Sequence, residues 1–170
     1  MIQILSLRIE EFRGIRSLEL KLDGKSFAVH GPNGSGKSGV VDAIGFALTG
    51  TIARLAGAGT AGISLQKHGP HVHRRGDPAA AWVELTFIDT SSGQVGTIRR
   101  SIKNPNSLTL DPDTPELRQA LAAAQAHPET TLSRREIIQF ILAEAGKRAA
   151  EVQALLQLGL GEHAAGEVDQ

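Results

Sequence analysis

Cysteine and tyrosine are absent from the 170 residues, tryptophan occurs once, and aromatic residues make up 4% of the chain. Without cysteine the protein can form neither disulfides nor thiolate metal sites. Charge of one sign is not in excess either, because 18 basic residues balance 18 acidic ones. A net charge of zero gives no overall attraction for nucleic acid, so any DNA contact would be local or would involve other parts of the protein.

Long hydrophobic runs are also missing. No apolar stretch approaches the ~20 residues that a membrane-spanning helix needs. The first residues, MIQILSLR, lack the basic start and the long apolar block of a secretory signal. We therefore expect no membrane contact and a cytoplasmic location, associated with the nucleoid if the protein is bacterial. An apolar content of 41% and a charged content of 21% are ordinary for a globular chain with a buried core.

The strongest motif present is GPNGSGKS at residues 31–38, which matches the phosphate-binding pattern G-x-x-x-x-G-K-[ST] at every fixed position. Glycines let the backbone pass close to an anion while successive N–H groups point toward it. A helix that starts near Lys37 would add unpaired N–H groups and the positive end of its dipole. Lys37 supplies a flexible positive charge for phosphates, and the Ser38 hydroxyl is an oxygen ligand suited to Mg²⁺. The motif therefore predicts a site for ATP with Mg²⁺.

The segments on either side of this loop have the patterns that the motif requires. Residues 26–30, SFAVH, form a short apolar run that predicts a buried strand. Residues 40–48 predict a helix, and Gly50 is a suitable stop because glycine tolerates the left-handed conformation at helix ends. Strand, loop and helix thus follow one another in the order of a P-loop.

A hairpin is predicted before the P-loop. Apolar residues alternate over residues 2–9 and again over residues 17–22, which predicts two strands, the first of them beginning almost at the first residue. Asp23-Gly24 predicts a tight turn from the second of these strands to the strand before the loop. A typical small P-loop kinase usually opens with the P-loop strand itself, so the additional hairpin is informative.

Three strings together resemble one family: IEEFRGI at residues 9–15, GPNGSGKS at 31–38 and VVDAIGFALTG at 40–50. They resemble the N-terminal head segment of the SMC/RecF-type ABC ATPases, a family that includes chromosome-segregation, recombination and double-strand-break repair ATPases. The resemblance is strong over residues 1–50 and looser beyond. It implies an α/β fold, the N-terminal half of a P-loop NTPase of ABC-ATPase type. That fold has a mixed sheet around the P-loop helix, an antiparallel β-meander and C-terminal helices.

The resemblance also implies which residues hold the nucleotide. Arg13 would lie beside the phosphates, where an arginine can form bidentate hydrogen bonds. The sequence itself gives Arg13 no partner, so a solvated charge in a turn is the alternative. Ser38 would hold the metal ion. The implied ATP-binding residues are Arg13, Asn33, Gly34, Ser35, Gly36, Lys37, Ser38 and Gly39.

Residues 51–80 have no regular period and predict a flexible, glycine-rich loop. Three histidines between residues 68 and 73 raise the possibility of zinc, but a Gly-Pro pair interrupts their spacing and no cysteine or paired acid completes a ligand set. Loop histidines are the better account. Arg74 and Arg75 follow directly and either contact a phosphate backbone or are simply solvated.

An antiparallel meander is predicted next, from alternating residues at 82–88, 95–102 and 108–110. In the SMC/RecF-type family a meander of this kind flanks the adenine side of the site, and the resemblance implies the same here. Arg99 and Arg100 lie on opposite faces of their strand, so at most one of them can face a ligand.

Two helices are predicted after the meander. Thr114 and Pro115 provide an N-cap and a first-turn proline, and residues 133–136 have capping-box spacing. The second stretch resembles the family segment in which a glutamine reaches toward Mg²⁺ and the attacking water. Here Arg134 or Arg135 stands in place of that glutamine. An arginine could contact phosphate oxygens directly, or both could merely cover the start of the helix.

Several parts of a complete ABC-type site are missing from the sequence. No apolar strand ending in Asp-Glu follows the P-loop, no Leu-Ser-Gly-Gly-type signature occurs, and no sustained heptad pattern is present. In the family these parts lie beyond a long coiled coil, in the C-terminal half of the head. We therefore expect ATPase activity in the full protein and almost none in this chain alone. The acidic Mg²⁺ ligand, the catalytic glutamate and the signature loop would have to come from elsewhere.

The sequence predicts one N-terminal lobe over residues 1–158 and a fraying tail over residues 159–170, leading toward the missing coiled coil. The tail is predicted to fray because it is rich in glycine and alanine. Four parts make up the lobe: a hairpin, P-loop and helix at 1–50, a flexible loop at 51–80, the meander at 81–110 and a helical part at 114–158.

The leading hypothesis is the ATP-binding half of an SMC/RecF-like head, in which ATP drives head engagement coupled to DNA binding or processing. Repair, recombination, chromosome maintenance and defence against foreign DNA all use such heads. Its partners would be the C-terminal half of the same head, a second head and DNA. One alternative is a self-sufficient P-loop phosphotransferase or small ATPase, for which Asp42, one helical turn after Ser38, is a poor acidic ligand. Another is an interaction module with a degenerate nucleotide site.

Overall fold

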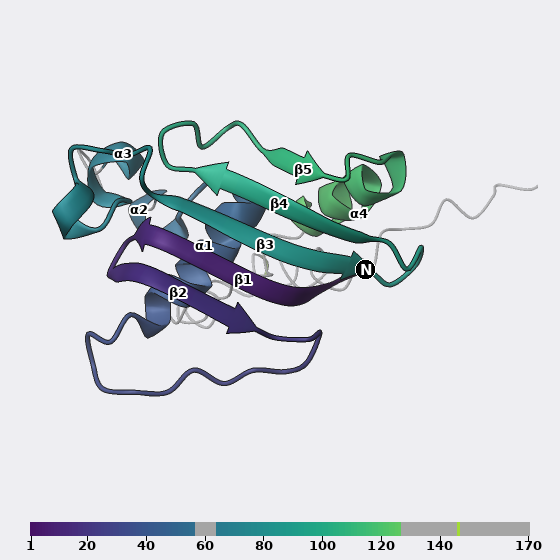
Figure 1. The fold of residues 1–170 in the computed structure, drawn as a ribbon, viewed down its shortest axis with the longest axis horizontal. Coiled ribbons are helices and arrows are strands. Elements are labelled where there is room, and N and C mark those ends of the chain that lie inside the picture. The colour runs from purple at the N-terminus through teal and green to yellow at the C-terminus, as the bar shows by residue number, and fades with distance from the viewer. Residues whose placement is uncertain (57–63, 127–145, 147–170) are drawn as a thin grey trace, which may run out of the picture. The chain divides into compact units, whose positions relative to one another are not determined.

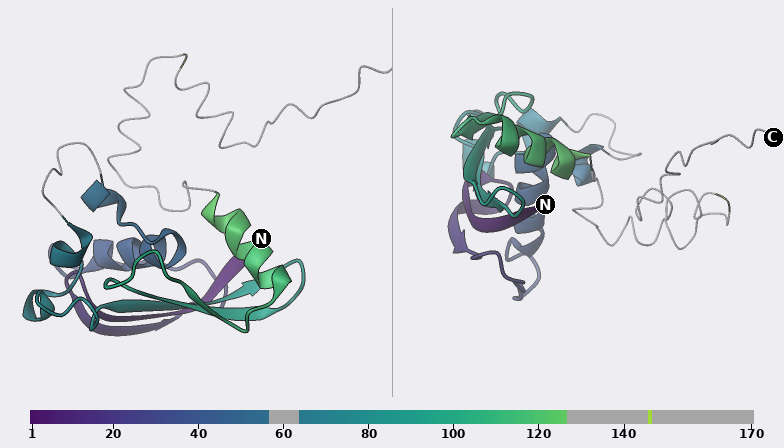
Figure 2. Two further views of the ribbon diagram at one scale, coloured as in Figure 1. Left: turned by 90° about the horizontal axis from the view of Figure 1, so that it is seen from above. Right: turned by 90° about the vertical axis from the view of Figure 1, so that its right-hand side faces the viewer.

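The computed structural model describes residues 1–56 and 64–126, together with Gly146. Over this part of the chain one β-sheet is covered on one face by helices α1 and α4 (Figure 1; Figure 2, left). The elements are β1 (Ile2–Phe12), β2 (Ile15–Lys21), α1 (Lys37–Thr49), α2 (Ala53–Ala56), α3 (Leu65–His68), a 3₁₀ turn (Val72–Arg74), β3 (Trp82–Asp89), β4 (Val95–Ser101), β5 (Thr109–Asp111) and α4 (Pro115–Gln125).

The sheet has five strands in the order β2-β1-β3-β4-β5, and every neighbouring pair is antiparallel. Strand β1 joins the hairpin to the meander, because it pairs with β2 on one side and with the meander strand β3 on the other. Alternation of apolar and polar residues directs Val83, Leu85 and Phe87 to the covered face, where all three are fully buried. The predicted hairpin and meander therefore belong to one sheet.

Helix α1 packs on the covered face through a row of small and aromatic side chains. Ala43, Phe46 and Ala47 are fully buried, and the ring centroid of Phe46 lies 5.3 Å from that of Phe12 at the end of β1. Such tilted aromatic pairs add to the free energy gained from burial of the rings. Helix α4 adds Leu117 to the same core. The packing fixes the helix that follows the P-loop against the end of the β1–β2 hairpin.

The strand predicted at residues 26–30 is not formed, and this expectation was wrong for the chain as the structure describes it. These residues have no strand pairing, and Phe27 and Val29 are 55% and 42% exposed. In Figure 1 the segment runs as a long loop beyond the edge strand β2. An apolar run becomes a strand only when a neighbour satisfies its backbone groups and covers its side chains, and no described segment does so here. The expected mixed sheet is accordingly antiparallel throughout the described residues.

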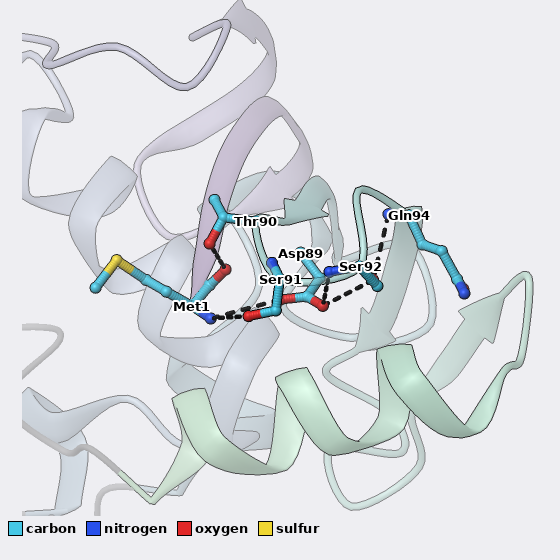
Figure 3. Close-up of polar contacts among 6 residues, drawn as sticks. All are labelled: Met1, Asp89, Thr90, Ser91, Ser92 and Gln94. Atoms are coloured by element: carbon cyan, nitrogen blue, oxygen red, sulfur yellow. Dashed lines mark hydrogen bonds and ion pairs between the residues drawn. The ribbon is translucent and has the colours of Figure 1, made fainter.

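The first residue is tied to the turn between β3 and β4 by a cluster of polar contacts (Figure 3). The amino group of Met1 lies 3.4 Å from Asp89 Oδ1, and the Thr90 backbone N–H donates to the Met1 carbonyl at 2.9 Å. The Ser92 hydroxyl and the Ser91 backbone N–H also donate to the Asp89 carboxylate, at 2.7 and 3.2 Å. The bonds to the carboxylate lower the pKa of Asp89 to about 2, with the Ser92 hydroxyl contributing most.

Candidate functional site

The P-loop turns through left-handed backbone at its glycines. Gly34 and Gly36 have φ angles of 85° and 86°, a conformation that other residues adopt only with strain. A Cβ atom on Gly36 would also lie 3.3 Å from the Ile15 side chain at the start of β2. Glycine is thus required at position 36 both for its conformation and for the close approach of the loop to the hairpin.

Helix α1 begins at Lys37 with no side chain capping its N-terminus and no acidic residue in its first turn. Its N-cap is Gly36, which has no side chain to offer. The Gly39 N–H donates to the Gly36 carbonyl at 2.7 Å, so the N–H groups of Lys37 and Ser38 and the positive end of the helix dipole are left to an external acceptor. This is the arrangement that binds phosphate at helix N-termini.

Lys37 lies folded against the loop that precedes it. Its Nζ donates to the carbonyl oxygens of Gly31 and Pro32 at 2.7 and 2.6 Å. Both acceptors are neutral, and the described residues provide no carboxylate as an ion-pair partner for this ammonium group. The positive charge of Lys37 is therefore uncompensated beside the uncapped helix.

Two clefts flank the P-loop. One, of about 610 Å³, lies between β2 and the segment 27–32 and is mainly apolar. The other, of about 330 Å³, lies beside the start of α1 and is rich in positive charge. Its lining includes Arg13, Gly36, Ser38, Asp42, Arg54 and Arg75. Of the residues implied by the family resemblance, Arg13, Ser38 and Gly39 line the smaller cleft, Ser35 and Lys37 line the larger one, and Gly36 lines both.

Arg13 stands in the turn of the β1–β2 hairpin, where its φ angle is 55°. Its backbone N–H donates to the Gly69 carbonyl at 2.7 Å, and its Nη1 donates to the His68 carbonyl at 3.2 Å. Its Nε lies 3.5 Å from Asp42 Oδ2. With three partners and a side chain only 26% exposed, Arg13 is not a freely solvated turn charge.

Asp42 and Arg54 complete this charged group, and sequence reasoning missed their association. The Asp42 carboxylate is 8% exposed and lies 3.3 Å from the Arg54 Nε, on the opposite oxygen from Arg13. Burial raises the pKa of Asp42, and the charges of Arg54 and Arg13, together with the contact from Arg13, oppose that rise. The spacing of Asp42 from Ser38, one helical turn, was a usable signal for its position. Arg54 lies beyond the end of α1, where no periodic pattern identifies it.

The other candidate residues have different surroundings. His71 Nδ1 lies 3.7 Å from Glu11 Oε2, and within residues 1–56 and 64–126 no three acidic or histidine side chains are grouped to hold a metal ion. Arg99 is exposed on the uncovered face of the sheet, whereas Arg100 is buried, as expected for opposite faces of a strand. Arg134 and Arg135 lie outside the described residues. No helix in the described part of the chain is both long and apolar enough to span a membrane.

Comparison with known families places the chain in a class of P-loop proteins. The model of the AAA domain family matches residues 6–158, which is most of the chain, and the chain belongs to this family. It is 35% identical, over 132 residues, to the DNA replication and repair protein RecF of Magnetococcus marinus. The alignment covers 75% of this chain and 31% of that protein, so the chain spans about a third of the relative's length. The resemblance to an SMC/RecF-type ATPase head segment is thereby confirmed.

Proposed function

We propose that this chain is the ATP-binding half of an SMC/RecF-like ATPase head that acts in DNA repair, recombination, chromosome maintenance or defence. The observation that carries the proposal is the start of α1. There, glycines in left-handed backbone lead into a helix with no cap and no acid in its first turn, next to the uncompensated charge of Lys37. A carboxylate or phosphate is the ligand such a site accepts, and the family favours ATP.

Each residue of the loop has a specific part in this proposal. The backbone N–H groups of residues 34–38 bind phosphate oxygens, and Lys37 exchanges its two neutral carbonyl acceptors for charged ones. Ser38 is the metal ligand, and Mg²⁺ at this position would neutralise phosphate charge. Arg13, held at the cleft by its three contacts, supports the phosphates. Arg134 or Arg135 would replace the glutamine that this family normally uses.

Completion of the head by its C-terminal half is the second part of the proposal. The exposed Phe27 and Val29 support it, because residues 26–30 have the pattern of a buried strand but no neighbour in the described chain. We expect this segment to become a strand of an ABC-type mixed sheet when the other half is present. Residues 1–158 would form the N-terminal lobe, and 159–170 would lead to a coiled coil.

In the complete protein, ATP binding would bring two heads together and change how they engage DNA in the cytoplasm. A self-sufficient phosphotransferase is less well supported. It needs an acidic Mg²⁺ ligand, and Asp42 is already engaged by two arginines. The chain alone should therefore bind ATP but hydrolyse almost none.

The test is ATP and ADP binding by calorimetry, together with steady-state hydrolysis, for this chain with and without the remainder of its protein. We expect binding by the chain alone and turnover only on reconstitution. Lys37→Ala should weaken ATP binding at least about tenfold, because it removes a charge-assisted contact. Lys103→Ala removes an exposed lysine from the turn that follows β4 and should leave binding unchanged. Turnover by the isolated chain, or no ATP binding at all, would contradict the proposal.

A further inference from the structure

Asp42 is an acidic side chain placed inside a site that otherwise attracts anions. It projects from α1 between the hairpin turn that bears Arg13 and the segment after α1 that bears Arg54. Each of its two oxygens faces one guanidinium group, Oδ2 toward Arg13 at 3.5 Å and Oδ1 toward Arg54 at 3.3 Å. One carboxylate therefore sets the position of two arginines that come from different parts of the chain.

The contacts leave both terminal nitrogens of Arg54, and Nη2 of Arg13, without a partner among the described residues. Asp42 faces each arginine through its Nε, the nitrogen nearest the backbone. Arg13 uses Nη1 on the His68 carbonyl, and Arg54 makes no other hydrogen bond or ion pair with the described residues. Terminal guanidinium nitrogens are the donors that bind phosphate oxygens in pairs. Both arginines line the cleft of about 330 Å³ that also contains Ser38.

Stability gives little reason for an ionised carboxylate at this position. Burial raises the pKa of Asp42, so the charged form is disfavoured in the folded chain despite two cationic neighbours. A buried ion pair is by itself weak evidence of a stabilising role, because replacing the whole pair by well-packed apolar residues is often neutral or stabilising. Arg54 is 44% exposed and would stay hydrated without its partner. The contacts of Asp42 with the two arginines are thus better explained by the position they give these arginines at the cleft than by a gain in the stability of the fold.

We propose that Asp42 is a positioning residue that holds Arg13 and Arg54 at the cleft beside Ser38, and that Arg54 is a second cation that binds the phosphates of the nucleotide. The inference rests on the proposed function, since it assigns further residues to the same ATP site. Two effects of Asp42 oppose each other: its charge repels phosphate, and its contacts orient the arginines. The inference requires that orientation dominates, because the carboxylate charge is already offset by both arginines.

The test compares the affinities of ATP and of inorganic tripolyphosphate for this chain by calorimetry. Arg54→Gln should weaken both ligands roughly tenfold, because it removes a charge-assisted contact to phosphate. Asp42→Asn should also weaken the binding of both ligands. In the double variant, which combines Asp42→Asn with Arg54→Gln, the loss beyond that of Arg54→Gln alone should be only the part of the Asp42 effect that acts through Arg13. Asp42→Glu should restore part of the affinity. Arg99→Gln is the control, because it removes an exposed arginine from the opposite face of the sheet.

A purely structural role is separated by thermal melting of the same proteins. We expect Asp42→Asn still to melt in one cooperative transition, well above the temperature of the binding assay, while its affinity falls. Unchanged affinity in Arg54→Gln, tighter binding in Asp42→Asn, or loss of ATP but not of tripolyphosphate affinity would each overturn the inference. If these results appear while Lys37→Ala still weakens ATP binding at least about tenfold, the proposed function stands. Absence of ATP binding by the unmodified chain would overturn both.

Discussion

Arg99 and Arg100 are adjacent in β4 but have opposite surroundings. The guanidinium group of Arg99 lies over the Trp82 ring, 3.8 Å from its centroid, on the uncovered face of the sheet. Arg100 is 5% exposed and donates from Nε to the Ala47 carbonyl and from Nη2 to the Leu48 carbonyl, at 3.1 and 3.2 Å. A buried cation at the last carbonyls of α1 satisfies acceptors that the helix leaves unpaired and complements its dipole. Strand alternation predicted this division, although it could not identify the helix end as the partner.

Asp89 makes the stability of the sheet dependent on pH. Its pKa is about 2 in the folded chain, against about 3.9 in an unstructured peptide, so the ionised form is the stabilising one. The contribution is complete above about pH 4 and is lost as the pH falls toward 2. Asp89→Asn should therefore lower the urea midpoint at pH 7, and its difference from the unmodified chain should shrink progressively between pH 4 and pH 2.

Asp77→Asn is the matched control for this pH series, because Asp77 is exposed and its side chain has no hydrogen bond in the described structure. It should follow the unmodified chain at every pH. A difference for Asp89→Asn that stays constant down to pH 2 would mean that its carboxylate does not hold the first residue to the β3–β4 turn.

Gly50 shows why α1 ends where it does. Its φ angle is 77°, and its N–H donates to the Phe46 carbonyl at 2.8 Å, which closes the last turn. A Cβ atom here would lie 2.4 Å from the Pro105 carbonyl oxygen and 2.9 Å from Arg100 Nη1. The sequence predicted the stop from glycine alone. The close approach of the β4–β5 turn depends on tertiary packing, which no local pattern reveals.

Gly50→Ala should lower the free energy of unfolding by about 2–4 kcal/mol, since left-handed backbone and overpacking both oppose the added methyl group. Gly93→Ala is a close control, because Gly93 has a φ angle of 72° but open space around its Cβ position. That variant should cost only about 1 kcal/mol. Urea denaturation measures both. Equal losses would show that the Pro105 carbonyl moves aside at little cost.

At the scale of the whole molecule, local sequence patterns predicted the helices and strands whose hydrogen bonds and packing are provided within the described part of the chain. The β1–β2 hairpin, the meander, α1 and α4 all follow from alternation, turn residues and caps, and they lie close to the predicted residues. Residues 26–30 differ, because a central strand depends on neighbours that are far away in sequence or lie on another segment. The grouping of Arg13 with Arg54 was hidden for the same reason, since only the folded backbone brings the two segments to Asp42.

Phe27 and Phe46 provide the comparison that tests this account. Phe46 is fully buried in α1, so Phe46→Ala should lower the stability of the chain by about 3–5 kcal/mol. Phe27 is 55% exposed, so Phe27→Ala should change it by less than about 0.5 kcal/mol. Urea denaturation of the isolated chain measures both, and a large loss for Phe27→Ala would show that residues 26–30 are already packed.

The same variant separates folding of the chain from assembly of the head. If the C-terminal half covers residues 26–30, Phe27→Ala should weaken its association with this chain at least about tenfold, as expected for an aromatic side chain at an interface centre. Val95→Ala removes an apolar side chain that is 46% exposed at the start of β4, away from the P-loop, and should leave association unchanged. Equal association for all three proteins would place the contact elsewhere. Weaker association for Phe27→Ala alone would show that the C-terminal half of the head binds residues 26–30. The isolated chain derives almost no stability from these side chains, so the loss could not be ascribed to unfolding.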